Sequence, residues 1–592
     1  MVRLVSVSAW LPALQLQLLL PLLALPSPSS AQIPIMTVYE PPPSSFGTNA
    51  SAPQWHTLLG NALFYYDAQR AGKLPANYRV TWRNDSVLND GKDVGLDLSA
   101  GYFDAGNFIK CTLPLGWAMS EIAWGATLYG RAFETAAQTP YLDEVLRNGL
   151  DWLLEATSLN TTTVVQVGTT LDNYWGGDQN IPTNRPSYVA TSDKPATDIV
   201  ASTAAAFAAG YLLYSGTTVP LSPSAQSKRH ASSVPTSLQD NNYAQNLLAR
   251  ARYLFDYAQT AQPQQVGQRS VPALSQSYPS TDWRDKLAHA GAMLTLATGD
   301  PAIANQTLTA YSNAAIPQIG ASISWDGRAA AASVLMAQAA VMHPSLGLNL
   351  SRFQSDAEAW FDSFADGSPS KGSGLSYTPG GMLWFSGYSD SSSLNPALNA
   401  AVFALAYSGF ATANKESTYV SFAQSQINYA LGDNPMNAVY PVGMSNNSAQ
   451  NPHSALASGG NNIANIDNSP PVEAYVLYGA LVGGPDHDDQ YYDQRSDYVQ
   501  TEPALDLQAP LVVLTASQVL NSTSSEPFYV SLTSPRIQPT RGGGGGGGGV
   551  SQGGAIAIAV IVLVIVFGGG GALAYWKRDS LRYWWRHKRL GI

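Results

Sequence analysis

The chain of 592 residues contains very little cysteine and few charged side chains. Cys111 is the single cysteine, which excludes an intramolecular disulfide, so the fold must depend on a hydrophobic core, and a chain of this length can bury one. Charged residues make up only 12%, and the net charge is −10. A nucleic-acid-binding protein would carry basic patches, and a net-acidic protein repels anionic polymers, so both kinds of partner are disfavoured. No group of residues has the spacing of metal ligands, and we predict no metal site and no cofactor.

Residues 1–31 form an apolar N-terminal segment. Arg3 is followed by the run LPALQLQLLLPLLALP and then by SPSSA. This order predicts a secretory signal peptide that is cleaved near Ala31. An N-terminal membrane anchor is the less favoured alternative, because Gln and Pro interrupt a short apolar run.

A second apolar run, AIAIAVIVLVIVFGGGGALAYW, occupies residues 555–576. Its length matches the ~20 apolar residues that span a bilayer, and the basic residues of 577–592 predict a cytoplasmic tail. We therefore expect a type I single-pass protein of the plasma membrane or secretory pathway, with its N-terminal part extracellular or lumenal. The Asn-x-Ser/Thr sequons agree with this topology because they precede the predicted span, at Asn49, Asn84, Asn160, Asn305, Asn349, Asn446 and Asn521.

From about residue 50 to 520, Ala-rich apolar segments with helical spacing are separated by Gly-, Pro- and Asn-rich loops. Two-residue alternation is nearly absent, so the sequence predicts an all-α fold. One domain, residues 32–520, accounts for the pattern. Within it, the polar run 219–242 is predicted to be a disordered surface insertion, and residues 521–554 are predicted to form a Gly-rich stalk.

The run LVGGPDHDDQYYDQRSDYVQTEPALDLQA, residues 481–509, alternates acidic with aromatic residues. Carboxyl groups transfer protons and aromatic rings pack on the apolar faces of sugars, so this composition suits a site that cleaves sugars. A solvated surface loop can have the same composition, and the run alone does not decide between the two. A second segment, far upstream, favours the interpretation as a site that cleaves sugars.

Three upstream motifs follow one another closely: QRAGKLP (69–75), WRNDSVLNDG (82–91) and DLSAGYFDAGN (97–107). They resemble the opening motifs of glycoside hydrolase family 9, and further matches follow in family order as far as NPH (451–453). The family's C-terminal signature, aromatic-x-Asp-x4-aromatic-x3-Glu, is matched by Tyr491, Asp493, Tyr498 and Glu502. The resemblance covers about residues 50–518. It implies an (α/α)6 barrel whose open end carries a cleft, and activity on β-1,4-glucan with inversion.

Inverting hydrolysis needs a carboxylic acid that protonates the leaving oxygen and a carboxylate that activates water, ~6.5–9.5 Å apart. The resemblance implies that Glu502 is the acid. The structural alternative is a carboxylate at a helix start, since Thr501-Glu502-Pro503 has the pattern of a helix N-terminus. A helix N-terminus lowers a carboxyl pKa, whereas a general acid needs a raised one, so we expect a nearby carboxylate, Asp493 or Asp104, to raise it.

The catalytic base is the position at which this sequence departs from the family motif. The family's second Asp in the DAGD motif is the base, and the first helps to hold the attacking water, but this chain has Asp104-Ala105-Gly106-Asn107. Three alternatives follow: Asp104 acts as the base, Asn107 only orients water and hydrolysis is slow, or the protein binds glucan without cutting it. We favour the first. The structural alternative for Asp104 is an ordinary turn residue.

The resemblance also implies the substrate contacts. His453 corresponds to a family histidine that contacts sugar hydroxyls, although the arginine of that motif is missing here, and Gln508 replaces a family Asn. Asp493 is expected to orient Arg495 or Glu502, and Arg495 is a candidate substrate contact. Trp384, Trp175 and Tyr498 are the preferred sugar platforms; Trp82, Trp117, Trp124 and Trp325 are further candidates, each more typical of a core. Some relatives hold structural calcium, but its ligands are not identifiable in this sequence.

Two functions from different classes fit these observations. The first is a membrane-anchored endo-β-1,4-glucanase acting on cellulose or a related wall glucan. The second is a catalytically weak glucan-binding or wall-remodelling surface protein, which Asn107 and the missing arginine would favour. An exo-acting glycosidase on the same barrel is a third. The sequence does not determine the oligomeric state.

Overall fold

A computed structural model describes residues 53–160, 162–170, 174–223, 234–445 and 447–521. The chain divides into two units, residues 1–539 and 540–592, and the second lies wholly outside the described residues. The predicted signal peptide (1–31), membrane span (555–576) and cytoplasmic tail (577–592) also lie outside them, as does the predicted stalk (521–554) apart from Asn521.

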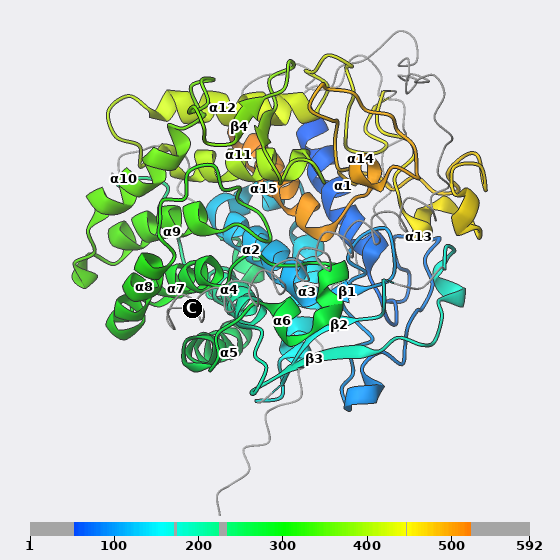
Figure 1. Ribbon diagram of the computed structural model, residues 1–592, viewed down its shortest axis with the longest axis horizontal. Coiled ribbons are helices and arrows are strands. Elements are labelled where there is room, and N and C mark those ends of the chain that lie inside the picture. Colours follow the sequence, from blue (N-terminus) through cyan, green and yellow to red (C-terminus); the bar gives the residue numbers. More distant parts are fainter. Residues whose placement is uncertain (1–52, 161, 171–173, 224–233, 446, 522–592) are drawn as a thin grey trace, which may run out of the picture. The chain divides into compact units, whose positions relative to one another are not determined.

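Six helices form a closed inner ring in the described part of the chain (Figure 1). They are α2 (Thr112–Thr135), α4 (Thr197–Tyr214), α7 (Arg284–Thr298), α9 (Ala329–Met342), α11 (Leu394–Ser408) and α15 (Leu505–Asn521). Each contacts the next, and α15 returns to contact α2. These helices are buried on nearly every face, which explains their Ala-rich composition without an apolar stripe.

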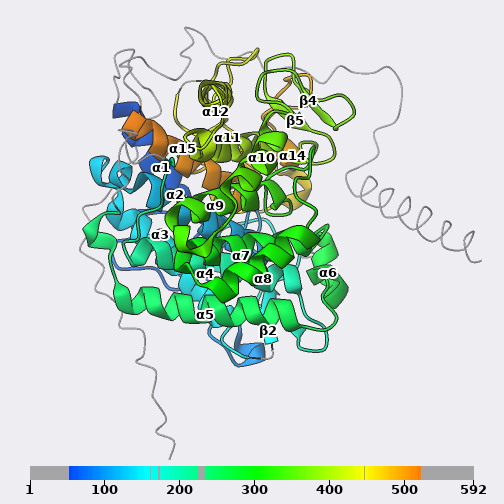
Figure 2. The ribbon, with the colours of Figure 1, turned by 90° about the vertical axis from the view of Figure 1, so that its left-hand side faces the viewer.

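Six further helices lie outside this ring, each against one inner helix: α1 on α15, α3 on α2, α5 on α4, α8 on α7, α10 on α9 and α12 on α11. Figure 2 shows α5 and α8 beside α4 and α7. Their bounds are Pro53–Gln69, Thr139–Ala156, Asn241–Thr260, Pro301–Asn313, Leu350–Phe361 and Glu416–Ala430. Outer and inner helices alternate along the chain, and this alternation confirms the predicted (α/α)6 barrel.

The fold also contains short strands, which the sequence did not predict. β1 (Lys110–Cys111), β2 (Thr162–Val167) and β3 (Ser187–Thr191) form an antiparallel sheet, and β4 (Leu375–Tyr377) pairs with β5 (Leu383–Phe385). Strands of two to six residues are too short to show a two-residue alternation. Short helices complete the elements: α6 (Gly267–Ser270), α13 (Ala455–Ser458), α14 (Tyr498–Thr501), and the 3-10 helices η1 (Lys92–Val94), η2 (Asp178–Asn180), η3 (Thr236–Leu238), η4 (Pro272–Gln276), η5 (Pro344–Leu346) and η6 (Ile463–Asn465).

The prediction that residues 219–242 form a disordered insertion is wrong at both ends that the structure describes. Val219, Val234 and Leu238 are buried in the core, and the Asp240 side chain caps α5 by accepting from the Tyr243 N–H. These apolar residues are isolated within a Ser-rich run, which is why composition did not reveal them. Residues 224–233 lie outside the described part of the chain.

One helical stretch among the described residues, Tyr498–Asn521, is long and apolar enough to cross a membrane. Within its most apolar window of 18 residues, 89% is buried, and α15 closes the inner ring of the barrel. Its apolar character is therefore accounted for by the protein core.

Candidate active site

The upstream and C-terminal motifs meet at Gly106. Its N–H donates to Glu502 Oε1 at 2.9 Å, and its carbonyl accepts from the Ala455 N–H at 2.8 Å. A Cβ atom at this position would lie 2.1 Å from the His453 carbonyl oxygen and 2.9 Å from Glu502 Oε1. Only glycine allows so close an approach, so Gly106 determines how the two motifs fit together.

Asp104 lies two residues before Gly106 and is buried, with 1% of its surface exposed. The Tyr278 hydroxyl donates to its Oδ2 atom, and its carbonyl accepts from the Leu505 N–H at 3.0 Å. Its Oδ1 atom has no hydrogen-bond partner within the described protein. Burial, with smaller contributions from Asp506 and Glu502, raises the pKa of Asp104 well above its usual value, and the Tyr278 hydrogen bond opposes the rise.

Asn107 is partly buried, three residues after Asp104 on the same loop. Its Oδ1 atom accepts from the Ile109 N–H at 3.2 Å. The amide Nδ2 can donate to a water molecule, but an amide cannot take the water's proton. Asp104 is therefore the one residue of the segment 104–107 whose side chain can accept a proton from water.

Glu502 does not start a helix, contrary to one of the two expectations for it. It ends α14, and α15 begins at Leu505, so the first-turn acid of α15 is Asp506. Burial raises the pKa of Glu502, while His453 and the Gly106 N–H oppose the rise. The expected cause was a nearby carboxylate, Asp493 or Asp104; desolvation is the cause found instead.

His453 lies beside Glu502, and its imidazole ring contacts Arg495, Trp175 and Tyr498. Its Nδ1–H donates to the Arg495 carbonyl at 2.5 Å, since a carbonyl can only accept. The Trp175 ring lies 4.8 Å from the imidazole centroid and the Tyr498 ring 6.1 Å away. Tyr498 is 58% exposed, whereas Trp175 is buried. The structure thus groups three of the predicted substrate contacts next to the predicted acid.

Asp493 and Arg495 hold the backbone segments on either side of His453 and its neighbours. Asp493 accepts from the Gln450 and Asn451 N–H groups at 3.0–3.1 Å, directly before the segment that carries His453. Arg495 is buried; it is ion-paired with Glu473 at 2.9 Å and donates to the carbonyls of Ile466 and Pro470. Its guanidinium thus holds the loop around residues 466–473, within the protein.

The other aromatic candidates fall into two classes. Trp117 and Trp124 lie in the barrel core, which agrees with the expectation that they are core residues and not sugar platforms. Trp384, on β5, also belongs to the buried core, with 7% of its surface exposed, and lies edge-on to His487 with ring centroids 5.1 Å apart. Trp82 stacks flat on Tyr475, with ring centroids 4.8 Å apart, and Tyr475 is 40% exposed.

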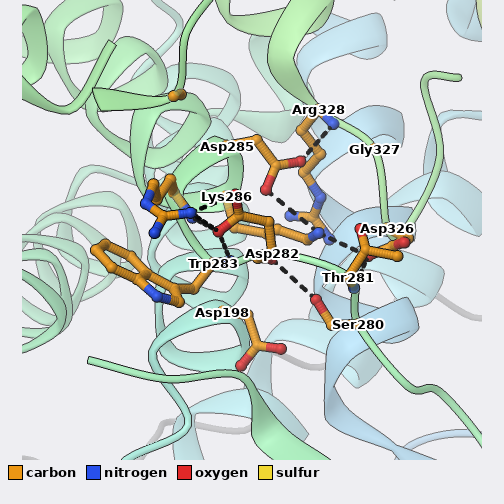
Figure 3. Close-up of polar contacts among 12 residues, drawn as sticks. Asp198, Ser280, Thr281, Asp282, Trp283, Asp285, Lys286, Asp326, Gly327 and Arg328 are labelled. Atoms are coloured by element: carbon orange, nitrogen blue, oxygen red, sulfur yellow. Dashed lines mark hydrogen bonds and ion pairs between the residues drawn. The ribbon is translucent and has the colours of Figure 1, made fainter. Parts of the chain in front are cut away.

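A buried ionic network, in which Lys286 pairs with Asp285 and Asp326, lies beside residues 280–283 (Figure 3). The same loop carries Tyr278, the hydrogen-bond partner of Asp104. Lys286 donates to Asp326 Oδ1 at 2.7 Å, and the Thr281 N–H donates to the same atom at 2.8 Å. Trp325, next to Asp326, packs edge-on against Tyr278 with centroids 4.9 Å apart. The network therefore fixes the loop that aims the Tyr278 hydroxyl at Asp104.

Sequence reasoning missed Tyr278, Asp506 and Glu473. Tyr278 lies in SQSYPST, a run with no feature beyond turn residues. Asp506 does carry a signal, because it lies four residues after Glu502 at the start of the last helix. No group of three or more His, Cys, Asp or Glu side chains in the described ranges is arranged to hold a metal ion.

We expect Asp326→Asn to lower the free energy of unfolding by about 3 kcal/mol, because it leaves a buried Lys286 ammonium with one partner fewer. Urea denaturation followed by tryptophan fluorescence measures this. The matched control is Asp282→Asn in the same loop, whose ion pair with Arg284 is partly exposed and is worth about 0–1 kcal/mol. Equal losses in the two variants would contradict the role given to the network.

The sequence profile of Glycosyl hydrolase family 9 matches residues 55–515. Endoglucanase A of Bacillus pumilus is 33% identical over 461 residues, which cover 76% of this chain and 64% of the relative. Endoglucanase 14 of Arabidopsis thaliana is 31% identical over 506 residues, covering 80% of this chain and 95% of the relative. The chain spans less than two thirds of the Bacillus relatives, 64% and 66% of their lengths.

Solved structures agree with the profile. The endoglucanase of the termite Nasutitermes takasagoensis superimposes with a TM-score of 0.68 at 30% identity, covering 79% of this chain and 98% of that one. The cellulase Cel9M of C. cellulolyticum, in complex with cellobiose, gives 0.66 at 27% identity, covering 78% and 98%. The profile match begins within α1 and ends within α15, so it reaches every one of the twelve barrel helices. The chain belongs to glycosyl hydrolase family 9.

Proposed function

We propose that this protein is an endo-β-1,4-glucanase that hydrolyses internal bonds of cellulose or a related β-glucan with inversion. The observation that carries the proposal is the contact at Gly106, which brings Glu502 to the loop of Asp104. Relatives named endoglucanases and a related cellulase solved with cellobiose support the substrate class.

In the proposed reaction, protonated Glu502 gives its proton to the glycosidic oxygen while the bond from that oxygen to the anomeric carbon breaks. Asp104 takes one proton from a water molecule, whose hydroxide adds to the anomeric carbon from the opposite face. Asn107 orients that water through its Nδ2 group. The pKa of Glu502 is raised by burial, and a raised pKa suits a general acid because the carboxyl group then holds its proton to a higher pH than an ordinary glutamate.

The substrate would be held by the aromatic group next to Glu502. Tyr498 offers an exposed ring, and His453, whose Nδ1 is occupied by the Arg495 carbonyl, has Nε2 for a sugar hydroxyl. Trp175 supports the imidazole from its other side. Trp384 is placed on a separate hairpin, β4–β5, and would act at a more distant part of the glucan.

The proposal extends to location: a type I single-pass protein with the barrel outside the cytoplasm. The apolar run 555–576, the basic tail that follows it and the N-terminal segment 1–31 support this. All five sequon asparagines among the described residues are exposed, as glycan attachment requires: Asn84, Asn160, Asn305, Asn349 and Asn521.

Glu502→Gln and Asp104→Asn should each lower reducing-end release from carboxymethyl cellulose by at least ~100-fold, because each removes one proton-transfer group. Glu134→Gln, an exposed carboxylate at the end of α2, is the matched control and should leave the rate unchanged. A wild type as inert as both variants, yet retained on cellulose, would favour the catalytically weak glucan-binding protein. Glucose as the first product would indicate exo-cleavage.

Asn107→Asp tests which residue is the base. With Asp104 as the working base, a carboxylate at 107 changes kcat by less than about tenfold, because proton transfer already has its acceptor. Steady-state rates on cello-oligosaccharides measure this. A gain of ~100-fold or more would mean that the wild-type chain lacks a base, and would overturn the assignment to Asp104.

The full chain should remain in the membrane pellet after an alkaline carbonate wash, since a spanning helix resists extraction that removes peripheral proteins. A variant ending at residue 540 is the control and should be secreted. Recovery of the full chain in the wash supernatant would contradict membrane anchoring.

A further inference from the structure

Large apolar side chains on the described surface are concentrated in one segment. Nine such side chains are exposed among the residues that the structure describes, and four of them lie between residues 463 and 476: Ile463, Val472, Tyr475 and Val476. Scattered apolar residues are ordinary on a protein surface, whereas a concentration of them in one place is typical of a binding surface. The segment 459–476 therefore calls for a partner.

This segment begins beside the candidate active site. A Cβ atom at Gly460 would lie 2.5 Å from the Ser469 carbonyl oxygen and 3.1 Å from the Trp175 ring. The two ends of the loop between Gly460 and Ser469 thus meet next to Trp175, which itself contacts His453. The segment is therefore continuous with the group of residues proposed to hold the substrate.

The second half of the segment is held in place by its backbone. Arg495 donates to the Pro470 carbonyl at 2.8 Å and pairs with Glu473 at 2.9 Å. The N–H groups of Ala474 and Tyr475 donate to the carbonyls of the last two residues of α13, at 3.2 and 3.1 Å. A surface that is ordered before its ligand arrives loses little conformational freedom on binding.

Tyr475 is the aromatic member of this surface, and its ring lies flat on Trp82. The two ring planes differ by 7°, and their centroids are 4.8 Å apart. Trp82 is partly buried and packs on the same small apolar cluster that contains Trp175. Because Trp82 covers one face of Tyr475, the 40% of Tyr475 that is exposed belongs to the opposite face and the edge of the ring. Such a ring can pack on the apolar face of a pyranose.

The charges of the segment favour an uncharged ligand. It contains no lysine or arginine, and its two carboxylates are engaged within the protein, Glu473 by Arg495 and Asp467 by the N–H and hydroxyl of Ser496. Amide side chains, which can donate to and accept from sugar hydroxyls, are exposed along it at Asn461, Asn462, Asn465 and Asn468. Aromatic, apolar and amide groups together suit a neutral polysaccharide.

We propose that Tyr475, supported by Trp82, forms a second glucan-binding surface, separate from the group around Glu502, which holds a β-glucan chain that extends beyond that group. The inference deepens the proposed function and rests on it for the choice of glucan as the ligand. Tyr475 takes no part in proton transfer; it retains long chains and does not affect the bond-breaking step.

Adsorption to swollen amorphous cellulose tests this surface, with the full chain kept in solution by a mild detergent and with Glu502→Gln present so that no glucan is cut. Tyr475→Ala should then raise the dissociation constant about three- to tenfold, because one stacking ring is lost. Tyr475→Phe keeps the ring and should bind as the unsubstituted chain does. Tyr475→Gln also removes the ring and should match Tyr475→Ala, so the result does not depend on one variant folding.

Steady-state kinetics with Glu502 intact separate binding from a structural effect on the site. Tyr475→Ala should raise the half-saturating concentration of swollen cellulose about three- to tenfold while kcat stays within about twofold, because the lost contact stabilises bound chain and transition state equally. A general distortion of the site would instead lower kcat, on cellotetraose as well as on the polymer.

The matched control is Tyr253→Ala, since Tyr253 on α5 is exposed to a similar degree, 37%. Its adsorption should be unchanged. Unaltered adsorption in folded Tyr475→Ala and Tyr475→Gln, an equal loss in Tyr253→Ala, or a matching fall of kcat on cellotetraose would each overturn the inference. So would self-association that disappears with Tyr475, which would assign the surface to a second copy of the chain. Adsorption that depends on Tyr475 in a wild type that cuts no glucan would overturn the proposed hydrolysis and leave the inference standing.

Discussion

The site depends on the missing side chain at Gly106. Segments 396 positions apart in the sequence meet there through one 2.9 Å hydrogen bond to a carboxylate and one 2.8 Å bond from the loop that follows His453. A methyl group would occupy the space of the His453 carbonyl oxygen. The position of the Glu502 carboxyl group relative to the Asp104 loop is therefore set by its hydrogen bond to the Gly106 backbone.

Burial raises the pKa of three carboxyl groups, those of Asp104, Glu502 and Asp506. The barrel wall around them is built from Ala-rich helices with few charges, so desolvation dominates each pKa and all three are raised. What distinguishes them is the number and kind of donors that each side chain meets. Glu502 has a peptide N–H and a histidine, Asp506 has the Asn395 amide and a helix N-terminus, and Asp104 has a tyrosine hydroxyl.

The sequence predicted the barrel because helical spacing and motif order extend over the whole domain, and both properties survive small local errors. It also predicted that Asp104, Glu502 and His453 come together. It could not predict Tyr278 or the Lys286–Asp326 pair behind it, because their importance comes from contacts between loops distant in sequence. The role of Arg495 was equally hidden, since an arginine in an acidic, aromatic run has the same pattern whether it faces a sugar or the loop around Glu473.

The last helix has a consequence for biosynthesis. α15 closes the inner ring between α11 and α2, and Glu502 directly precedes it. A nascent chain thus acquires its acid and the final wall of its barrel in one step, when residues 498–521 leave the ribosome. Until then the loop near residue 104 lacks its hydrogen-bond partner Glu502, so the candidate site is complete only when the ring is closed.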